Sequence, residues 1–461
     1  MIDKIPPHIL EINKKFTDAG FDIYLVGGSV RDLLCKRTVA DWDLTTSATP
    51  AQMLELFPDS VYENKFGTVG IKVAELEESE HKGVVEVTTF RTEKGFSDKR
   101  HPEKVKWGKT VEEDLGRRDF TINAMALNIS KIKDQKSNMI IDPFGGAKDL
   151  ENKIIRAVGD AAVRFKEDAL RLMRAIRFAS QLGFSIEENT LSEIVNDSEL
   201  LSFIAKERVR DELYKILASD FPYEGVMMLK NTNLLKHIIP ELLEGVGVSQ
   251  VRPGRHHTED VFTHNVLSLK HTPSTNSVVR LATLIHDVGK PRVASSDEEG
   301  LIIFHNHEIA GAKIARVVAE RLRLSKKDLE KIVILVRWHM FTVDEHITDA
   351  AVRRFIRRIG VGNVQDMMDL RVGDRLGGGT QTAESWRLKL FKKRLEEQLA
   401  PAPFSITDLA INGQDIMKEL DIKPGPEIGK ILQKLFEEVD EDLEKNNRNY
   451  LLRRLKDMRL S

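Results

Sequence analysis

The chain has 461 residues, 41% of them hydrophobic and 31% charged, with a formal net charge of −2. A chain of this length exceeds what a single hydrophobic core supports, so we expect a protein of three or four domains. The near-neutral charge excludes a protein-wide basic field, and a nucleic-acid partner would have to bind local basic faces.

Targeting signals and disulfides are also absent from the sequence. Met1 to Pro7 lack the basic-then-apolar pattern of a signal peptide, and no uninterrupted apolar run is long enough for a membrane helix. Cys35 is the single cysteine, which excludes an internal disulfide and agrees with a reducing compartment. We therefore expect a cytoplasmic protein with no membrane partner.

The first chemical motif follows a predicted strand at residues 23–26. Four apolar β-formers there lead into Gly27 and Gly28, which predicts a sharp turn into a helix. The free N–H groups at the start of that helix, together with Arg31, suit a phosphate.

A pair of carboxylates follows about ten residues later. Asp41 and Asp43 stand two residues apart, which predicts that both lie on one face of a second strand. Paired carboxylates repel each other unless a cation lies between them. Hard oxygen ligands in this arrangement suit Mg²⁺ that carries a polyphosphate.

A glycine turn or an Asp-x-Asp pair alone is a weak signal, but the two in this order are specific. They resemble the head of the polymerase β-type nucleotidyltransferases, in particular the bacterial class II tRNA nucleotidyltransferase (CCA-adding) and poly(A) polymerase family. The resemblance implies an α/β (α+β) head followed by all-helical domains. It implies that Asp41 and Asp43 are the catalytic Mg²⁺ ligands and that Gly28 and Arg31 bind the triphosphate.

Downstream of the carboxylates, the sequence predicts a helix over residues 50–57 and strands over residues 67–74 and 84–91. Glu86 lies in the second of these strands. It is either a third carboxylate beside the metal or a solvated strand residue.

Residues 92–110 are polar and punctuated by Gly and Pro, which predicts a mobile loop. The resembled family has a flexible loop here that helps the final adenine addition. The full length of the loop argues against an enzyme that adds only C, as do its charged residues Arg91, Glu93, Asp98 and Arg100.

A second cluster of charges begins at residue 113 and runs into an apolar helix. Arg118, Asp119 and Asn123 could bind the sugar and phosphates of a nucleotide, or could form an ordinary surface helix cap. The stretch resembles the second motif of the same family. That resemblance implies that Arg118 is a nucleotide ligand and that Asp119 and Asn123 contact the ribose or orient Arg118.

The pattern over residues 163–179 predicts one helix with Leu170, Met173 and Ile176 toward a core. Four charged residues step by three along another side of this helix. Such a row is most often an exposed face laced with ion pairs. The four are Asp168, Arg171, Arg174 and Arg177.

Base chemistry suggests a sharper role for two of the four. Cytosine and adenine present an amino donor beside a ring-nitrogen acceptor, whereas uracil and guanine present a carbonyl beside a ring N–H. Asp168 as acceptor and Arg171 as donor match the first pair, so one protein site could select C and A without a template.

This helix resembles the Glu-Asp-x-x-Arg motif of the family. The resemblance implies the base-selecting roles of Asp168 and Arg171, and it implies that Arg174 and Arg177 contact the nucleotide or its phosphates. Residues 206–213 resemble the next family motif, and for them we expect a role in bracing the neck helices.

Nine of the 13 histidines lie between His256 and His346. Imidazoles and carboxylates drawn from several helices suit a transition metal that activates water for phosphoester hydrolysis. The His-Asp doublet, with spaced histidines and a distal Asp, resembles the HD superfamily of metal-dependent phosphohydrolases over about residues 253–378. The resemblance implies a core ligand set of His264, His286, Asp287 and Asp374, with His307 and His339 as ligands of a second metal.

From about residue 380 the chain is again helical, with basic faces that either follow tRNA phosphates or are simply solvated. Another candidate basic patch consists of Arg353, Arg354, Arg357 and Arg358. We expect four parts: a nucleotidyltransferase head over 1–148, a helical neck for base selection over 149–250, an HD domain over 253–380 and a helical RNA-binding region over 381–461.

The leading interpretation is template-independent addition of C and A, or at least of the terminal A, to the 3′ end of tRNA. CTP and ATP would be the substrates and pyrophosphate the product, with HD phosphohydrolase activity as an addition. One alternative is a poly(A) polymerase or an A-adding specialist. The other is an HD phosphohydrolase or phosphodiesterase whose head is a degenerate RNA-binding module.

Overall fold

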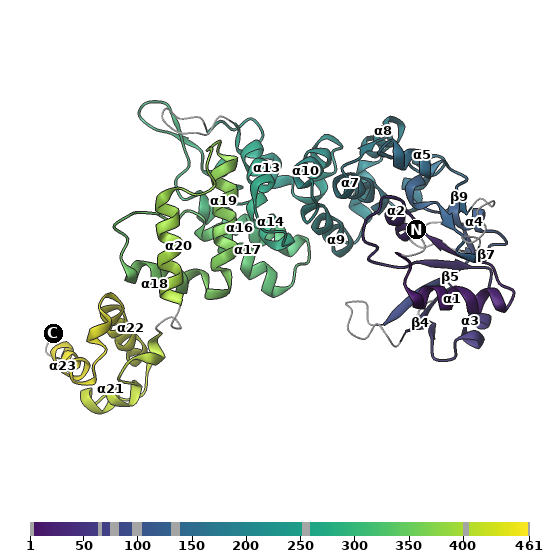
Figure 1. Cartoon of the computed structure of the whole chain (residues 1–461). Helices are drawn as coiled ribbons and strands as arrows, with labels where there is room; N and C mark the ends of the chain where they lie inside the picture. Colours follow the sequence, from purple (N-terminus) through teal and green to yellow (C-terminus); the bar gives the residue numbers. More distant parts are fainter. Residues whose placement is uncertain are drawn as a thin grey trace. The chain divides into compact units, whose positions relative to one another are not determined.

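The computed structural model describes residues 4–62, 67–73, 83–94, 104–130, 139–250, 259–399 and 405–459 (Figure 1). The chain divides into two compact units. Unit 1 comprises residues 1–243 with 321–324, and unit 2 comprises residues 244–320 with 325–461. No helix in the described ranges combines the length and the apolarity of a membrane span.

A seven-stranded sheet forms the centre of the N-terminal part of unit 1. Leu44 lies opposite Val87 in its one parallel pair, β2 with β5, and the other neighbouring strands are antiparallel. The spatial order is β3 (Val61–Tyr62), β4 (Thr68–Lys72), β5 (Val84–Thr89), β2 (Leu44–Thr46), β1 (Ile23–Val26), β8 (Ala126–Leu127) and β9 (Ile140–Ile141).

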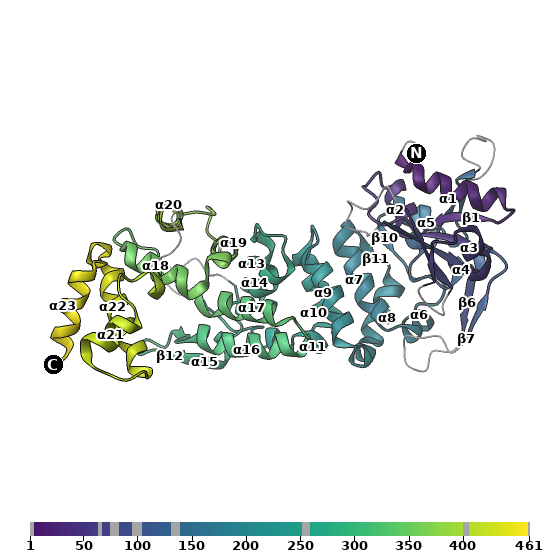
Figure 2. The same cartoon turned by 90° about the horizontal axis from the view of Figure 1, so that it is seen from below.

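Three helices pack their apolar side chains into one core with this sheet, and Figure 2 shows them around β1. They are α1 (Pro7–Asp18), α2 (Gly28–Leu34) and α3 (Pro50–Leu56). The predicted helix over 50–57 and the predicted strands over 67–74 and 84–91 are confirmed as α3, β4 and β5. β5 consists of Val and Thr around Glu86, and such β-branched residues pack well on a pleated sheet.

The carboxylate pair precedes β2 rather than lying within it. Asp41 and Asp43 were predicted on one face of a strand, but the strand begins at Leu44. The amide of Val26 donates to the carbonyl of Asp43 at 3.0 Å, so the pairing with β1 reaches only that residue. Asp41 is exposed, where water solvates its charge.

The predicted loop over residues 92–110 contains a β-hairpin. β6 (Arg91–Lys94) pairs with β7 (Lys104–Trp107), so the prediction of a loop is wrong at its two ends. The ring of Trp107 lies on Gly67, where an added Cβ would be only 2.6 Å away. The middle of the predicted loop, with Asp98 and Arg100, lies outside the described residues.

The rest of unit 1 is mainly helical. Residues 154–155 and 185–186 form a short parallel ladder, β10 (Ile154–Ile155) with β11 (Ser185–Ile186). The helices are α4 (Val111–Gly116), α5 (Gly146–Glu151), α6 (Ala161–Glu167), α7 (Leu170–Leu182), α8 (Glu188–Asn196), α9 (Lys206–Leu217), α10 (Pro222–Asn231), α11 (Leu235–Ile238) and α12 (Pro240–Leu243). α5 runs through the predicted head and neck boundary at residues 148 and 149.

The single helix predicted over residues 163–179 is two helices. Asp168 is extended, with φ −140° and ψ 104°, and separates α6 from α7. Its carboxylate accepts the backbone N–H of Leu170 at 3.0 Å, and an Asp that bonds a nearby amide in this way competes with helix continuation. The predicted core positions are confirmed, because Leu170, Met173 and Ile176 are buried in α7.

Unit 2 begins with a bundle of helices. The small strands β12 (Ser295–Ser296) and β13 (Ile302–Ile303) pair beside it. The helices are α13 (Val261–His271), α14 (Ser277–Leu284), α15 (Lys290–Val293), α16 (His307–Arg321), α17 (Lys326–Trp338), α18 (Asp349–Ile359), α19 (Val364–Gly377) and α20 (Trp386–Leu399).

Two glycines allow α13 and α19 to approach each other closely. A Cβ at Gly377 would lie 2.4 Å from Oγ of Ser268, and one at Gly373 would lie 2.5 Å from Oγ1 of Thr272. This approach brings the side chains of two helices that are far apart in sequence into the same site, as described below.

A separate core forms the C-terminal part of unit 2, from α21 (Gly413–Leu420), α22 (Pro426–Glu441) and α23 (Arg448–Arg459). It is joined to α18 by Asp440, which pairs with Arg353 at 2.9 Å and with Arg357 at 2.5 Å. These two arginines were predicted in an RNA-binding patch. That prediction is wrong for Arg353, which is buried, while Arg354 is exposed.

Candidate functional site

The turn between β1 and α2 needs glycine for two separate reasons. Gly27 has φ 71°, a left-handed conformation that other residues adopt only at a cost. A Cβ at this position would also lie 2.8 Å from Nη1 of Arg118 and 3.6 Å from Oδ2 of Asp43. The glycine therefore lets a guanidinium and a carboxylate from two other segments reach the start of α2.

A cavity of about 700 Å³, here called the head cavity, opens at this turn. Eight basic and five acidic side chains line it, and this positive excess suits a polyanionic ligand. The structure brings together all the residues predicted for catalysis or nucleotide binding in the head and neck. These are Asp41, Asp43, Gly28, Arg31, Arg118, Asp168, Arg171, Arg174 and Arg177.

A chain of hydrogen bonds holds two of the arginines at the cavity. Arg31 donates to both oxygens of Asp32 and, through Nη1, to Oδ1 of Asn123, each at 2.9 Å. Asn123 donates to Asp119 at 3.2 Å, and Asp119 accepts from Nε of Arg174 at 2.7 Å. Burial opposes ionisation of Asp119, but the nearby arginines and Asn123 outweigh it and hold the pKa of Asp119 below its ordinary value.

Arg118 is held by an acid that the sequence did not single out. Its Nη2 donates to Oδ2 of the buried Asp114 at 3.2 Å, and Arg117 binds the other oxygen of Asp114 at 2.7 Å. Among the described contacts, Asp119 and Asn123 orient Arg174 and Arg31 instead of Arg118, and both also line the cavity.

The two carboxylates form an oxygen-only donor pair. Burial raises the pKa of Asp43, Arg118 opposes this shift, and the charge of Asp41 adds to it. A divalent cation between them would relieve the repulsion, and carboxylate oxygens are the donors that hard cations prefer. The donor set therefore fits the predicted Mg²⁺.

Asp168 and Arg171 both line the head cavity, and each has another partner. Oδ2 of Asp168 accepts from Nη2 of Arg208 at 2.9 Å. Nη1 of Arg171 donates to Glu167 at 2.7 Å, and its Nη2 donates to the carbonyl of Arg117 at 3.0 Å. The predicted acceptor and donor are thus held at one cavity wall by separate groups.

Phe178 collects three of the cavity arginines around its ring. The guanidinium carbons of Arg31, Arg174 and Arg177 lie 5.2, 5.3 and 4.0 Å from the ring centroid. Burial, followed by repulsion from Arg174, lowers the pKa of Arg177 to about 10, while the buried Glu212 at 3.3 Å opposes this shift.

Sequence reasoning did not identify several side chains that line the cavity. Arg208 and Lys215 come from α9, the helix predicted only to brace the neck. Their signal was the basic residues of that helix, since Arg208 and Lys215 lie two turns apart on one face. Phe178 and Gln181 also line the cavity, and their residue types carried no signal.

Glu86 lies on the exposed side of β5. The parallel register pairs Leu44 with Val87, so Glu86 is the β5 residue next in line with Asp43. It is not one of the described residues that line the head cavity. Its role as a third carboxylate stays a prediction.

A second group of titratable residues, here called the histidine cluster, lies in unit 2. His264 comes from α13 and Asp374 from α19, the two helices that approach through glycine. His286 and Asp287 follow α14, His307 starts α16, and His339 directly follows α17. The structure thus brings together all six predicted ligands, and all but Asp374 are buried.

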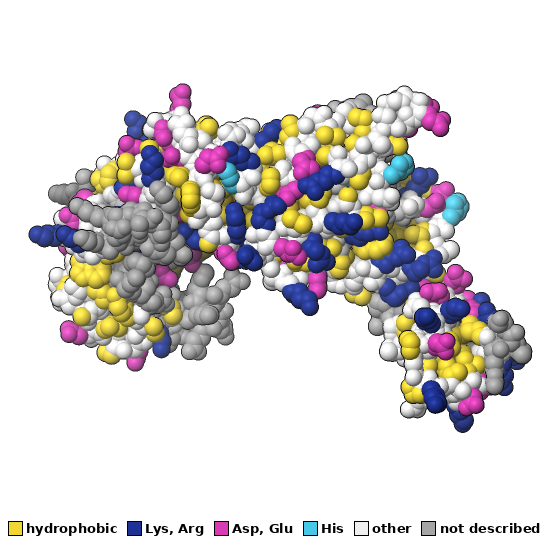
Figure 3. Space-filling view, turned by 180° about the vertical axis from the view of Figure 1, so that it is seen from behind, with side chains coloured by type: hydrophobic (Ala, Val, Ile, Leu, Met, Phe, Trp, Pro, Cys, Tyr) yellow, Lys and Arg dark blue, Asp and Glu magenta, His cyan; other side chains and the backbone are white. Residues whose placement is uncertain are grey.

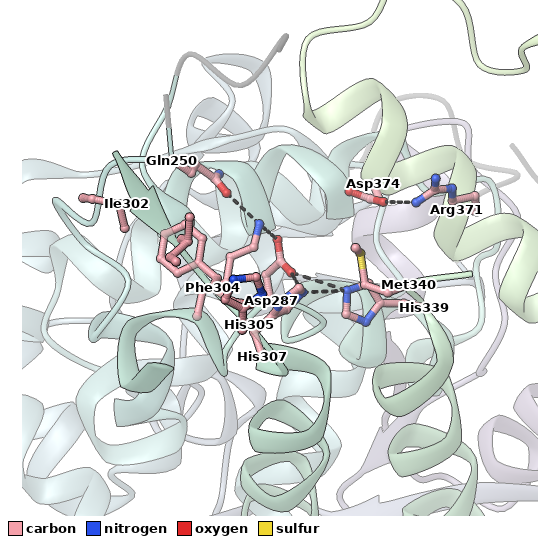
Figure 4. A pocket seen from close by; sticks show the side chains of 12 residues that line it. Gln250, Asp287, Ile302, Phe304, His305, His307, His339, Met340, Arg371 and Asp374 are labelled. Carbon is pink, nitrogen blue, oxygen red and sulfur yellow. Dashed lines mark hydrogen bonds and ion pairs between the residues drawn. The ribbon is translucent and has the colours of Figure 1, made fainter. Parts of the chain in front are cut away.

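Asp287 lies between two pairs of histidines, and Figure 4 shows it beside one of these pairs, His307 and His339. Its Oδ2 is 3.4 Å from Nε2 of both His264 and His286. Its Oδ1 is 3.1 Å from Nε2 of His307 and 3.5 Å from Nε2 of His339. One carboxylate therefore faces two imidazole pairs, an arrangement that fits two metal ions with a shared ligand.

The backbone fixes which nitrogen is presented by three of the four imidazoles around Asp287. Nδ1 of His286, His307 and His339 lies 2.7 to 2.9 Å from the carbonyl oxygens of Thr283, Phe304 and Val336. A ring N–H donated to a carbonyl leaves Nε2 as the metal-binding atom. Two sets of three donors come within 4.8 Å of one another, His264 with His286 and Asp374, and His286 with Asp287 and His339. The donor set fits a transition metal.

Neighbouring acids oppose the effect of burial on the charge of His286. Burial disfavours the imidazolium form of His286, but Asp287 and Asp374 outweigh it and raise the pKa of His286 to about 10. A cavity of about 380 Å³ opens beside the cluster, and two cations reach it. Lys290 contacts Asp287 at 2.5 Å. Arg371 donates to Asp374 at 3.0 Å (Figure 4).

Family models match four stretches of the chain. The "Poly A polymerase head domain" matches residues 23–156, and the "Probable RNA and SrmB- binding site of polymerase A" matches residues 183–245. The "HD domain" matches residues 257–374, and a tRNA nucleotidyltransferase domain 2 matches residues 388–455. Nucleotidyltransferase head domains and HD domains typically use divalent metals.

Curated relatives match over two different lengths. An A-adding tRNA nucleotidyltransferase of Deinococcus radiodurans is 33% identical over 431 residues, 90% of each chain. A CCA-adding enzyme of Anoxybacillus flavithermus is 31% identical over 90% of this chain and 88% of its own. A CCA-adding enzyme of Geobacillus kaustophilus is 43% identical, and there the match spans 50% of this chain and about half of the relative, 54%.

The fold is also similar to solved structures. The Bacillus stearothermophilus CCA-adding enzyme in complex with CTP aligns over 98% of both chains, with 27% identity and a TM-score of 0.71. A Thermotoga maritima CCA-adding enzyme complexed with tRNA aligns with 20% identity and a TM-score of 0.60, a likeness of fold.

Proposed function

The chain belongs to the bacterial tRNA nucleotidyltransferase and poly(A) polymerase family, and from this premise we propose that it adds C and A to the 3′ end of tRNA. CTP and ATP are the substrates, and pyrophosphate is the second product. The observation that carries the proposal is the head cavity, where the carboxylate pair, the arginines and the Asp168 and Arg171 side chains meet.

Four head residues at the cavity bind the metal and the triphosphate in the proposed reaction. Asp41 and Asp43 would hold Mg²⁺, which when bound polarises the α-phosphate and neutralises the triphosphate. Gly28 and Arg31 bind the triphosphate at the start of α2. The 3′-hydroxyl of the tRNA attacks the α-phosphate, and positioning by these residues contributes much of the acceleration.

The cavity arginines have proposed roles in orientation. Arg118 binds the nucleotide beside the turn at Gly27. The guanidinium of Arg118 can lie this close to the turn because Gly27 has no Cβ. Arg174 and Arg177 contact the nucleotide or its phosphates. Both guanidinium groups lie near the ring of Phe178, and this positively charged surface supports the proposed contact with a phosphate.

Asp168 and Arg171 select the base. Asp168 accepts the exocyclic amino group of cytosine or adenine, and Arg171 donates to the neighbouring ring nitrogen. Uracil and guanine would place a carbonyl against the carboxylate and a ring N–H against the guanidinium. This selection requires no template strand.

The test uses tRNA transcripts that lack part of the 3′ end. With transcripts that end before CCA and after CC, the wild type should add CCA and A, respectively, from CTP and ATP, as sizing of products on a gel would show. Asp41→Ala should reduce incorporation by about 10³-fold or more, because the cation loses one of its two carboxylates. Normal incorporation by Asp41→Ala would refute the proposal.

The same assay separates the alternatives. Addition of A only to transcripts that end in CC would identify an A-adding specialist, the activity for which the Deinococcus radiodurans relative is named. Long A tails on unrelated RNA would identify a poly(A) polymerase.

The histidine cluster supports a second candidate function, hydrolysis of phosphate esters. Six ligand side chains from several helices meet beside a cavity that Lys290 and Arg371 also line, which suits a phosphate. Ring opening of 2′,3′-cyclic phosphates, or release of phosphate from terminal phosphates on RNA, that survives Asp43→Asn but not Asp287→Asn would establish this activity. Hydrolysis that depends on Asp43 would refute a separate site.

We propose that the chain has the four parts predicted from the sequence and that residues 381–461 bind RNA. On the face shown in Figure 3, Lys and Arg side chains are interspersed with acidic ones, so tRNA would contact local basic groups. We propose the cytoplasm as the compartment, where the tRNA substrate is processed. Binding of tRNA by the whole chain should weaken steeply with salt if phosphates dominate the contact.

A further inference from the structure

We infer that Arg208 is a positioning residue for base selection and acts through Asp168, an inference that rests on the proposed function. The guanidinium reaches Asp168 from α9, a helix about 40 residues further along the chain. Arg208 and Asp168 both line the head cavity. The pair therefore lies where the edge of the base is read.

Asp168 lies between two helices and belongs to neither, so no helix fixes the direction of its side chain. Its backbone is extended between α6 and α7, so its orientation depends on the groups that its oxygens contact. Oδ1 accepts the N–H of Leu170 at 3.0 Å, and Oδ2 accepts Nη2 of Arg208 at 2.9 Å. Nη1 of Arg208 approaches Oδ1 at 3.4 Å. One contact ties the carboxylate to the backbone of α7, and the fork of Arg208 sets its plane.

These contacts leave acceptor capacity for a base. A carboxylate offers about four acceptor positions, and Leu170 with the two N–H groups of Arg208 fills three. An amino group of cytosine or adenine can take the remaining position without displacing Arg208. The side chain of Arg208 thus aims the carboxylate and does not need to leave when the nucleotide arrives.

Arg171, the donor half of the selector, is fixed in a similar way. Its Nη1 donates to Glu167 at 2.7 Å and to the carbonyl of Arg164 at 3.0 Å, and its Nη2 donates to the carbonyl of Arg117 at 3.0 Å. These bonds use three of the five N–H donors of a guanidinium. Acceptor and donor are therefore each held rigid by an outside group, Arg208 for Asp168 and Glu167 for Arg171.

Rigidity of both halves is what discrimination requires. A mobile carboxylate could turn away from the carbonyl of uracil or guanine, and the mismatch would then cost little. A carboxylate held by Arg208 stays against that carbonyl, so the wrong base keeps its repulsive contact. Arg208 therefore contributes to the rejection of UTP and GTP more than to the binding of CTP and ATP.

The test is a double-mutant cycle on the whole chain. We would measure kcat and KM for CTP, UTP, ATP and GTP on tRNA acceptors with the wild type, Arg208→Ala, Asp168→Ala and the double variant. Arg208→Ala should lower the ratio of kcat/KM for CTP over UTP by about tenfold, within what one bidentate contact contributes to base discrimination. In the Asp168→Ala background, Arg208→Ala should change the ratio by less than about twofold.

Arg210 provides a matched control on the same helix. It pairs with Asp211 at 2.7 Å and is not among the described residues that line the head cavity. Arg210→Ala should leave the CTP over UTP ratio unchanged. Arg208→Lys, which keeps the charge but loses the fork, should show an intermediate ratio with a melting temperature equal to that of the wild type.

Two results would overturn the inference. One is an equal fall in kcat/KM for all four nucleotides with an unchanged ratio, which would make Arg208 a phosphate contact or a structural brace. The other is an equal effect of Arg208→Ala with and without Asp168. A wild type that adds neither C nor A to any tRNA acceptor would instead refute the proposed function.

Discussion

The head cavity and the histidine cluster both bring carboxylates together with basic side chains, but they use different chemistry. In the head cavity, the carboxylate pair of Asp41 and Asp43 shares the lining with seven arginines, and the donors are oxygens. In the histidine cluster, Asp287 is surrounded by four imidazoles. Oxygen donors suit a hard cation that travels with a nucleotide, whereas imidazoles suit a transition metal that stays bound.

The largest test of this comparison is a reciprocal pair of variants. Asp43→Asn should reduce nucleotide incorporation by about 10³-fold, because the metal site loses a charge, and should leave the transition-metal content of the purified protein unchanged. Asp287→Asn should lower that metal content by about half or more and leave incorporation within about threefold. Incorporation rates and elemental analysis of the same preparations measure both effects.

Each variant in this pair is the control for the other. The substitutions are close in size to the original side chains, which limits effects on packing. Loss of nucleotide incorporation in Asp287→Asn would show that the two sites depend on each other and would end the comparison.

The next test concerns the close approach at the head cavity. Gly27→Ala would place a methyl group 2.8 Å from Arg118 and force a left-handed conformation on alanine. We expect kcat/KM for CTP to fall by about 10- to 100-fold, because Arg118 must move by a few tenths of an ångström or more. Gly145→Ala is a matched control, since Gly145 also has positive φ, at 74°, but an added Cβ there meets nothing within 4 Å.

If the two glycine variants reduced kcat/KM equally, backbone strain rather than contact with Arg118 would explain the loss. Thermal melting should show destabilisation of both variants, larger for Gly27→Ala, because Gly145 has the αL conformation with ψ 27° whereas Gly27 has ψ −135°, which alanine adopts at a higher cost.

The pH dependence of metal binding should separate the two sites as well. The pKa of His286 is raised to about 10, so a metal that binds Nε2 of this imidazole at neutral pH must displace a proton. Metal affinity of the histidine cluster should therefore rise with pH, by about tenfold per unit for one displaced proton, between about pH 6 and 9.

The head behaves differently because its ligands are acids. Burial raises the pKa of Asp43 from its ordinary value, so protons compete with the cation on the acid side. The Mg²⁺ requirement of incorporation should change little above neutral pH and should increase as the pH falls. Titrations of metal binding and of incorporation at several pH values would measure both trends. A flat profile for the histidine cluster would contradict the proton displacement.

The sequence predicted residue types at the two sites better than it predicted backbone paths. All nine head residues line one cavity, and all six predicted histidine-cluster ligands lie together, because each motif places several of them at fixed spacing along the chain. The strand at Asp41 and Asp43 and the single helix over 163–179 were wrong. At Asp168 a local hydrogen bond from the N–H of Leu170 to the carboxylate competes with helix continuation, and near Asp43 the pairing with β1 reaches only the carbonyl of that residue.

Partners from other helices could not be predicted from local patterns. Arg208 and Asp168 are 40 residues apart, and Arg174 and Asp119 are 55 residues apart. Which arginine meets which acid depends on how α4, α7 and α9 pack. Hydrophobic periodicity specifies that each helix has a buried face but does not specify its neighbours.

The smallest expected effect concerns Glu86 and would sharpen the picture of the head. Glu86 is exposed on β5, next in line with Asp43, and is absent from the described lining of the cavity. If two carboxylates suffice, Glu86→Gln should change kcat by less than about threefold, because an exposed carboxylate outside the metal site contributes little to its field. A fall of about 100-fold with an increased Mg²⁺ requirement would make Glu86 a third ligand. Thr88→Val, on the same face of the strand, controls for packing. If Glu86 is a third ligand, the head resembles the histidine cluster, because both sites then draw their metal ligands from more than two positions.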